Sequence, residues 1–108
     1  MTFEEFNKLL DCRIETTKQV LASKNAEYAR NNDKLSNFKR AASLEQSTPE
    51  KALSGMLTKH IISVYDMIDD LEQGKNGKIE TWNEKIGDTI NYMILLEALI
   101  NERFEGTK

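Results

Sequence analysis

Three polar side chains near the C-terminal end of the sequence have the types and spacing of a ligand-binding site. Glu84, Asp88 and Asn91 are about one helical turn apart, so in a helix they lie on one face. The same line continues into Leu95, and residues 93–100 are apolar apart from one glutamate, as expected of a helix packed on several sides. A carboxylate in such surroundings needs a cation, a proton or a hydrogen-bond donor, because burying it alone costs several kcal/mol. We therefore expect this polar line to face a ligand or a partner side chain.

Carboxylate oxygens favour a hard divalent cation. The metal ligands we expect are Glu84 and Asp88, joined by Asp66 from an earlier helical segment, and the expected ion is Mg²⁺. Zinc is less suited, because Cys12 is the single cysteine of the chain and His60 its single histidine.

A second polar line has the chemistry to contact a phosphate. Lys59 and Ser63 lie one turn apart and lead to Asp66, with His60 beside them at the edge of an apolar face. A lysine can hold a phosphate, and a histidine can bond either a phosphate or a neighbouring carboxylate. The alternative is a solvated helix face on which His60 is only a hydrogen-bonded packing residue.

Aromatic and polar residues also gather around a break in the helical pattern at Asn31, Asn32 and Asp33. Side chains of these types can stack on a base, bond its edge and hold a phosphate. The alternative is local, with caps and core residues that have no ligand. Together with residues of the last helix, the ligand contacts we expect here are Lys24, Tyr28, Asp33, Asn37, Phe38, Lys39, Asn91 and Tyr92.

Four helices are expected to position these groups. Apolar spacing predicts a first helix that starts after Thr2 and ends near Ala29, and a short second helix that begins near Ser36 or Asn37. Thr48 followed by Pro49 predicts the start of a third helix, which ends at the turn 74–77.

The expected start of the fourth helix bears on the role of Glu84. Thr81 is the cap that we expect, and Glu84 stands at the reciprocal position of a capping box. Glu84 therefore has two open roles, as a cap for the backbone and as a metal ligand.

Length and composition predict a single all-α domain over residues 1–108, with a four-helix bundle-like fold. The chain of 108 residues is long enough for one core and too short for two, and helix formers outnumber β-branched and aromatic residues. Ile86 and Ile90 lie on one side of the last helix and Leu95 and Leu99 on another, more than a small monomer covers. We therefore expect a homo-oligomer, a dimer or a tetramer, with an oligomeric helical core.

Charge and hydropathy exclude several function classes. The formal net charge of −3 has the wrong sign for a protein that binds a nucleic-acid backbone, so duplex nucleic acid is not an expected partner. The first residues lack the apolar run of a signal peptide, and no apolar stretch approaches the ~18 residues that span a membrane. We expect a cytoplasmic protein with no membrane partner.

Four ordered motifs between Lys24 and about Glu102 also carry a family resemblance. They are Lys24-Asn25-x-Glu27-Tyr28, Asp33-x-Leu35-x-Asn37-Phe38-Lys39-x-Ala41-Ala42, Lys59-His60-x-x-Ser63 and Glu84-x-Ile86-x-Asp88-x-x-Asn91-Tyr92-x-x-Leu95-Leu96. This set resembles small phage and prophage proteins of unassigned role, which would place the protein in the host cytoplasm.

More distantly, the segment 84–88 is similar to the second acidic motif of the MazG-like all-α nucleotide pyrophosphohydrolases. That resemblance implies intertwined helical oligomers in which carboxylates from two helices bind magnesium, and the metal positions a nucleoside triphosphate for hydrolysis. The chain departs from the pattern at Lys85, where the family has a glutamate three residues before the aspartate. Its earlier helix carries Asp66 and Asp69 or Asp70 in place of two glutamates.

Three functions stay open on this basis. The first is a magnesium-dependent nucleotide-binding protein that is a MazG-like nucleoside triphosphate pyrophosphohydrolase, with Lys59 steadying the phosphates. The second is a non-catalytic phage protein that captures a nucleotide or a nucleotide-derived defence signal. The third is a helical protein-interaction module.

Overall fold

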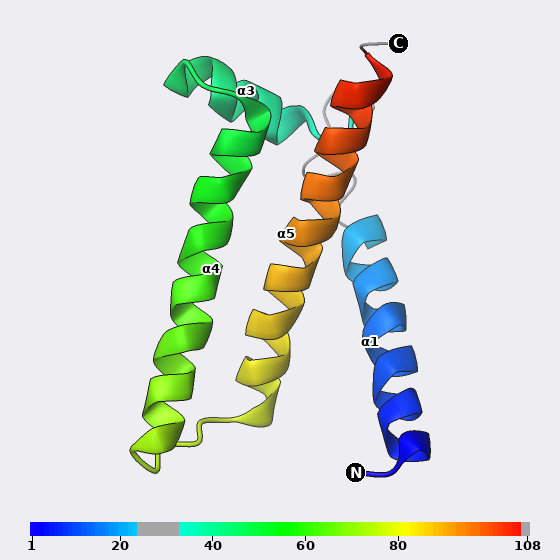
Figure 1. The fold of residues 1–108 in the computed structure, drawn as a ribbon, viewed down its shortest axis with the longest axis vertical. Helices are drawn as coiled ribbons and strands as arrows, with labels where there is room; N and C mark the ends of the chain where they lie inside the picture. The colour runs from blue at the N-terminus through cyan, green and yellow to red at the C-terminus, as the bar shows by residue number, and fades with distance from the viewer. Residues whose placement is uncertain (24–32, 107–108) are drawn as a thin grey trace.

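The computed structural model describes residues 1–23 and 33–106, and these residues form four α-helices with no strand among them (Figure 1). The helices are α1 (Phe3–Ser23), α3 (Ser36–Glu45), α4 (Pro49–Glu72) and α5 (Ile79–Glu105). The all-α prediction is confirmed, and so is the start of the short helix at Ser36. The predicted end of the first helix near Ala29 lies outside the described residues.

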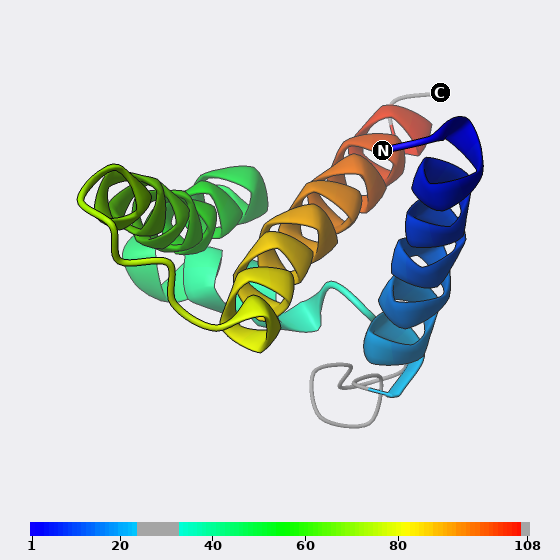
Figure 2. The ribbon, with the colours of Figure 1, turned by 90° about the horizontal axis from the view of Figure 1, so that it is seen from below.

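The helices meet around α5, which lies between α4 and α1 in Figure 1. The chain turns back between α4 and α5, so these two helices lie side by side in opposite directions (Figure 2). The α3 helix packs on α4 and approaches the C-terminal part of α5 (Figure 1). The buried core forms where α3, α4 and α5 meet, and it consists of Leu35, Phe38, Leu53 and Leu99. Leu53 is fully buried. This core holds three helices in a helical bundle.

Local sequence signals set the two ends of α4. The Oγ1 atom of Thr48 accepts a hydrogen bond from the backbone N–H of Lys51 at 3.2 Å, and Pro49 occupies the first turn, where it has no N–H to leave unpaired. After the helix, Gly74 has a φ of +80°. Its N–H and that of Lys75 bond back to carbonyls of the last turn, at 3.0 and 2.8 Å. The predicted start and end of this helix are confirmed.

The predicted cap of the last helix is wrong. α5 begins at Ile79, with Lys78 at the cap position and no capping side chain, so Thr81 lies inside the first turn. The Nε1 atom of Trp82 donates to the carbonyl oxygen of Asn76 at 2.7 Å, which folds the preceding loop back on the helix. Because Thr81 is not the cap residue, Glu84 has no capping role at Thr81.

α1 is attached to the other helices along part of its length. Arg13 donates from Nη2 to the carbonyl oxygen of Asn83 on α5 at 3.0 Å. Toward its N-terminal end α1 diverges from α5 in both views (Figures 1 and 2). The exposed apolar side chains of this helix are Phe3, Phe6, Leu9, Leu10 and Ile14.

Among the described residues, no helix combines the length and the apolar character needed to cross a membrane.

Candidate functional site

A cavity of about 450 Å³ lies where all four helices come together. Its wall includes the C-terminal end of α1, the start of α3, and the middle parts of α4 and α5. Six residues that the sequence predicts as ligand contacts or metal ligands line it, and they are Asn37, Phe38, His60, Asp88, Asn91 and Tyr92. Side chains from three helices therefore share one cavity.

Three aromatic rings form one side of the cavity. The rings of His60 and Tyr92 are 4.9 Å apart between centroids and tilted by 34°. Phe38 meets Tyr92 edge to face, with centroids 6.4 Å apart and an angle of 70° between the rings. Phe38 also belongs to the buried core, so its contact with Tyr92 joins this side of the cavity to that core. The cavity thus contains an aromatic surface anchored in the hydrophobic core.

Asp88 faces His60 across the interface between α5 and α4. Their Oδ2 and Nδ1 atoms are 3.7 Å apart, and 29% and 26% of the two side chains are exposed. This distance is longer than a direct hydrogen bond, so the attraction is electrostatic and is strongest when the imidazole is protonated. Asp88 is therefore partly buried and lies opposite a histidine of α4, as a polar line that faces a partner side chain requires.

Asn91 lies one turn after Asp88 and has an unpaired polar atom. Its Oδ1 atom is buried and accepts no hydrogen bond from any described residue. A buried acceptor without a donor costs about 1–3 kcal/mol. Oδ1 is out of reach of water in this side-chain position, but Asn91 lines the cavity, so a rotation of its amide would turn Oδ1 toward a donor on a bound molecule or an ordered water.

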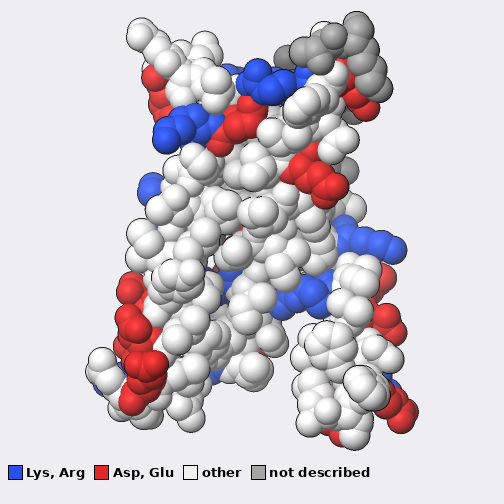
Figure 3. Space-filling model, in the orientation of Figure 1, with Lys and Arg blue, Asp and Glu red and all other residues white. Residues whose placement is uncertain are grey.

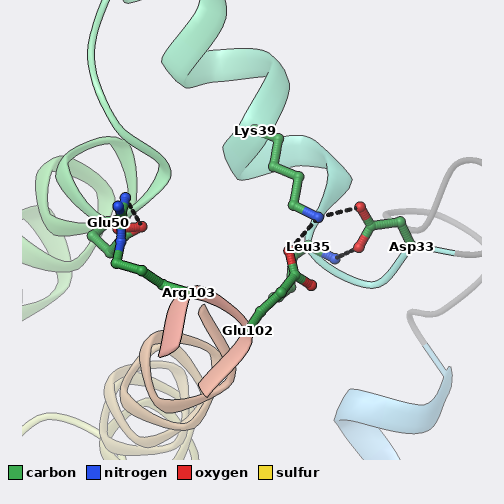
Figure 4. Close-up of polar contacts among 6 residues, drawn as sticks. All are labelled: Asp33, Leu35, Lys39, Glu50, Glu102 and Arg103. Carbon is green, nitrogen blue, oxygen red and sulfur yellow. Dashed lines mark hydrogen bonds and ion pairs between the residues drawn. The ribbon is translucent and has the colours of Figure 1, made fainter. Parts of the chain in front are cut away.

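Ion pairs fix the backbone at the α3 end of the cavity (Figure 4). The Nζ atom of Lys39 is 2.6 Å from Oδ2 of Asp33 and 2.6 Å from Oε1 of Glu102. Asp33 also accepts the backbone N–H of Leu35 at 3.0 Å, and the hydrogen bond from Lys39, followed by this one, lowers the pKa of the Asp33 carboxyl. The same two carboxylates raise the pKa of Lys39. Both predicted contacts, Asp33 and Lys39, therefore engage each other beside the cavity.

A second ion pair closes the same end of the molecule (Figure 4). Arg103 donates to both carboxylate oxygens of Glu50, from Nε at 2.8 Å and from Nη2 at 3.0 Å. This two-point contact joins the C-terminal part of α5 to the first turn of α4.

The remaining predicted residues do not line the cavity in the described part of the chain. Lys59 and Asp66 on α4 and Glu84 on α5 are exposed, and Ser63 is partly buried outside the cavity wall. Among residues 1–23 and 33–106, no three His, Cys, Asp or Glu side chains gather closely enough to hold a metal ion. Lys24 and Tyr28 lie outside the described residues.

Sequence reasoning did not select five residues of the cavity wall as site residues. They are Val20, Leu21, Lys34, Met56 and Leu95. Apolar periodicity marks the first two and the last as core positions, which does not distinguish a core from a cavity wall. Lys34 donates from Nζ to the carbonyl oxygen of Leu21 at 2.7 Å, so it joins the loop to α1. The sequence signal that could have identified Lys34 as a site residue is its position directly after Asp33, a predicted ligand contact.

No family model, no curated protein and no solved structure was found to match this chain. The resemblance to phage proteins and to the MazG-like hydrolases therefore stays a prediction from the sequence.

Proposed function

We propose that this chain is a cytoplasmic homo-oligomer that binds a nucleotide, or a small molecule derived from one, in the cavity between its helices. The observation that carries the proposal is the close, tilted pair of rings of His60 and Tyr92, which lies beside Asp88 and Asn91 in one cavity. An aromatic surface suits the face of a base, and an acid and an amide suit its polar edge or the ribose hydroxyls. A volume of about 450 Å³ also lies in the usual range for small-molecule sites.

Hydrogen-bonding capacity favours a ligand rich in N–H or O–H donors. The unpaired Oδ1 of Asn91 accepts hydrogen bonds, and so does the ionised carboxylate of Asp88. An exocyclic amino group or a ribose hydroxyl would satisfy either group. Asn37, which lines the cavity from α3, supplies an amide that both donates and accepts.

The phosphate group needs positive charge to offset Asp88. Lys34 lines the cavity and His60 faces it, so these two are our candidates for phosphate contacts. Magnesium suits this arrangement as an ion that arrives with the phosphates, because it is commonly held by one or two carboxylates together with phosphate oxygens. Asp88 is the carboxylate of the cavity wall, and Glu84 stands one turn before it.

Capture and hydrolysis use the same cavity but ask for different groups. Stacking and hydrogen bonding are enough for capture, which is the function we propose. Hydrolysis needs in addition a group that takes a proton from water, and the pair of Asp88 and His60 is the candidate in the described part of the chain. We keep hydrolysis as the second candidate for that reason.

Self-association is supported by the exposed apolar side chains of the chain. Large apolar residues are exposed on α1, α4 and α5, and examples are Phe6 on α1, Tyr65 on α4 and Met93 on α5. Monomers rarely leave so many such side chains in contact with water. A second copy of the chain would cover them, as closed symmetric oligomers commonly do.

Calorimetry with nucleoside mono- and triphosphates, with and without Mg²⁺, tests the proposed binding. We expect saturable heat for at least one nucleotide. Asp88→Asn should weaken the binding by at least about tenfold, because hydrogen bonds to a charged group are worth about 1.5–3 kcal/mol. Asp66→Asn is the matched control, since it makes the same change of charge on the exposed part of α4 and should bind like the parent.

Mass spectrometry separates the outcomes of this experiment. Nucleotide released unchanged from the denatured protein means capture, and a cleaved product in solution means hydrolysis. If no nucleotide gives heat with or without magnesium, the proposal is wrong and a helical interaction module is left. If both aspartate variants lose binding equally, net charge and not the cavity governs affinity.

A further inference from the structure

The face of α5 that points away from the cavity is apolar. On the cavity side the helix presents Asp88 and Leu95, whereas Ile90, Met93 and Ile100 lie on the opposite side at 3.6 residues per turn. These three residues line an open hollow of about 510 Å³. Figure 3 shows a mostly uncharged surface over α5, interrupted by an acidic patch on the upper part of the helix. α5 therefore has one face for the cavity and another that the described helices leave uncovered.

The uncovered face of α5 repeats every seven residues, and we name it the α5 seam. Its first row is Ile79, Ile86, Met93 and Ile100, and in its second row Ile90 and Phe104 alternate with Asn83 and Glu97. Apart from Ile90, which is partly buried, the apolar side chains of the seam are between 37% and 66% exposed. Two helices pack along each other in a left-handed supercoil when apolar positions recur every seven residues, with a second position four residues after the first.

We propose that the α5 seam is the contact between two copies of this chain, packed antiparallel about a two-fold axis near Met93. The inference rests on the proposed self-association and is independent of the nucleotide site, which lies on the other side of the helix.

The accessible surface of the chain is larger than that of a compact monomer of the same mass, as expected if a second copy covers part of it. A compact 12.4 kDa protein has about 6,100 Å² of accessible surface, whereas this chain has 8230 Å². Its radius of gyration is 16.4 Å, against about 13 Å for a compact domain of this length. The excess of about 2,100 Å² belongs to the whole chain, to which the exposed apolar side chains of α1 also contribute. For two copies it falls within the roughly 2,000–5,000 Å² that obligate homodimers bury in total.

Charge in the seam decides the direction of the partner helix. Glu97 stands in the second row, seven residues after Ile90. In a parallel pair in register, each Glu97 would face the Glu97 of the other copy, and like charges that face each other are destabilising. In the antiparallel pair, Glu97 lies beside Ile90 of the other copy, and the two carboxylates are about two turns apart.

Single cysteines test the seam and its direction. In a Cys12→Ser background, which removes the native exposed thiol, Met93→Cys should oxidise to a covalent dimer. Ile86→Cys and Ile100→Cys should each stay uncrosslinked when alone and should crosslink to each other when mixed. A parallel pair would crosslink each variant with itself and would overturn the proposed direction. Leu44→Cys, which is 87% exposed on α3 and outside the seam, is the matched control.

Sedimentation equilibrium separates this inference from the self-association on which it rests. The parent should be a dimer, Met93→Glu should sediment as a monomer with its helical circular dichroism retained, and Leu44→Glu should remain a dimer. A dimeric parent whose Met93→Cys variant does not crosslink overturns the seam and leaves the self-association. A monomeric parent overturns both, while nucleotide binding stays a separate measurement.

Discussion

The guanidinium group of Arg13 lies directly over Gly87, where α1 crosses α5. A Cβ atom at residue 87 would lie 2.6 Å from Nη1 of Arg13, closer than non-bonded atoms approach. Gly87 is buried, and Nη2 of the same arginine bonds the carbonyl oxygen of Asn83 at 3.0 Å. The missing side chain at Gly87 is therefore what lets α1 contact α5 through this arginine.

The contact between Arg13 and Gly87 predicts a non-additive pair of substitutions. Gly87→Ala should change the free energy of unfolding by less than about 1 kcal/mol. Alanine has a better helix propensity than glycine by about 1 kcal/mol, and this gain offsets the cost of displacing the Arg13 side chain. In an Arg13→Ala background the same substitution should stabilise by about 1 kcal/mol, since nothing opposes the gain. Urea denaturation of the four proteins measures the coupling, and strictly additive effects would contradict the contact.

The buried side chain of Leu53 should contribute strongly to stability. It is fully buried where α3, α4 and α5 meet. Leu53→Ala should lower the free energy of unfolding by about 2–5 kcal/mol, because it removes apolar contacts and leaves a cavity. Leu44→Ala, at an exposed leucine on α3, should stay within about 0.5 kcal/mol of the parent. Equal losses in the two variants would argue against this core.

The two threonines that the sequence predicts as caps should behave differently. Thr48→Ala should cost about 1 kcal/mol, because it removes the hydrogen bond to the N–H of Lys51. Thr48→Ser should keep most of that stability. Thr81→Ala should be neutral or slightly stabilising, since Thr81 lies inside α5 and alanine is the better helix former. Thermal melts compare the three variants, and a large loss at Thr81 would restore the capping box.

Stability should depend on pH at both ends of the scale through Asp33 and Lys39. The folded state lowers the pKa of Asp33 below 3.8, so its contribution is present above that value and is lost as pH falls through the lowered pKa. The pKa of Lys39 is raised above 10.5, so its contribution is present below that value and is lost as pH rises through the raised pKa. Denaturant titrations of the parent and of Asp33→Asn measure this, and the variant should show a weaker acid dependence.

Replacing Asn91 by an apolar residue should raise the stability of the free protein and weaken nucleotide binding. Asn91→Leu removes a buried acceptor that has no donor among the described residues, so the free protein should gain about 1 kcal/mol of stability. The same variant loses the acceptor that we expect a ligand to use, so nucleotide binding should weaken. Urea denaturation and calorimetry on one protein sample check both effects. A variant that is less stable than the parent would mean that Oδ1 has a donor in the free protein.

Helix positions follow closely from the sequence because the interactions that set them are local. Thr48, Pro49 and Gly74 act on backbone groups within about one turn, so their effect can be read without knowing the fold. The start of α5 could not be predicted in this way, because Trp82 bonds to a loop carbonyl six residues earlier, at Asn76. A contact of that range depends on how the loop folds.

The site could be predicted from the sequence only as far as one helix extends. Asp88 and Asn91 belong together because helical geometry puts them on one face, and the structure places both on the cavity wall. Which residues meet them from α4 and the loop depends on the rotation and crossing of the packed helices. That packing brings His60 and Lys34 to the cavity and leaves Lys59 outside its wall. Side-chain spacing along one helix is a local property, whereas the relative orientation of two helices results from burying all their apolar faces at once, so only the tertiary structure decided it.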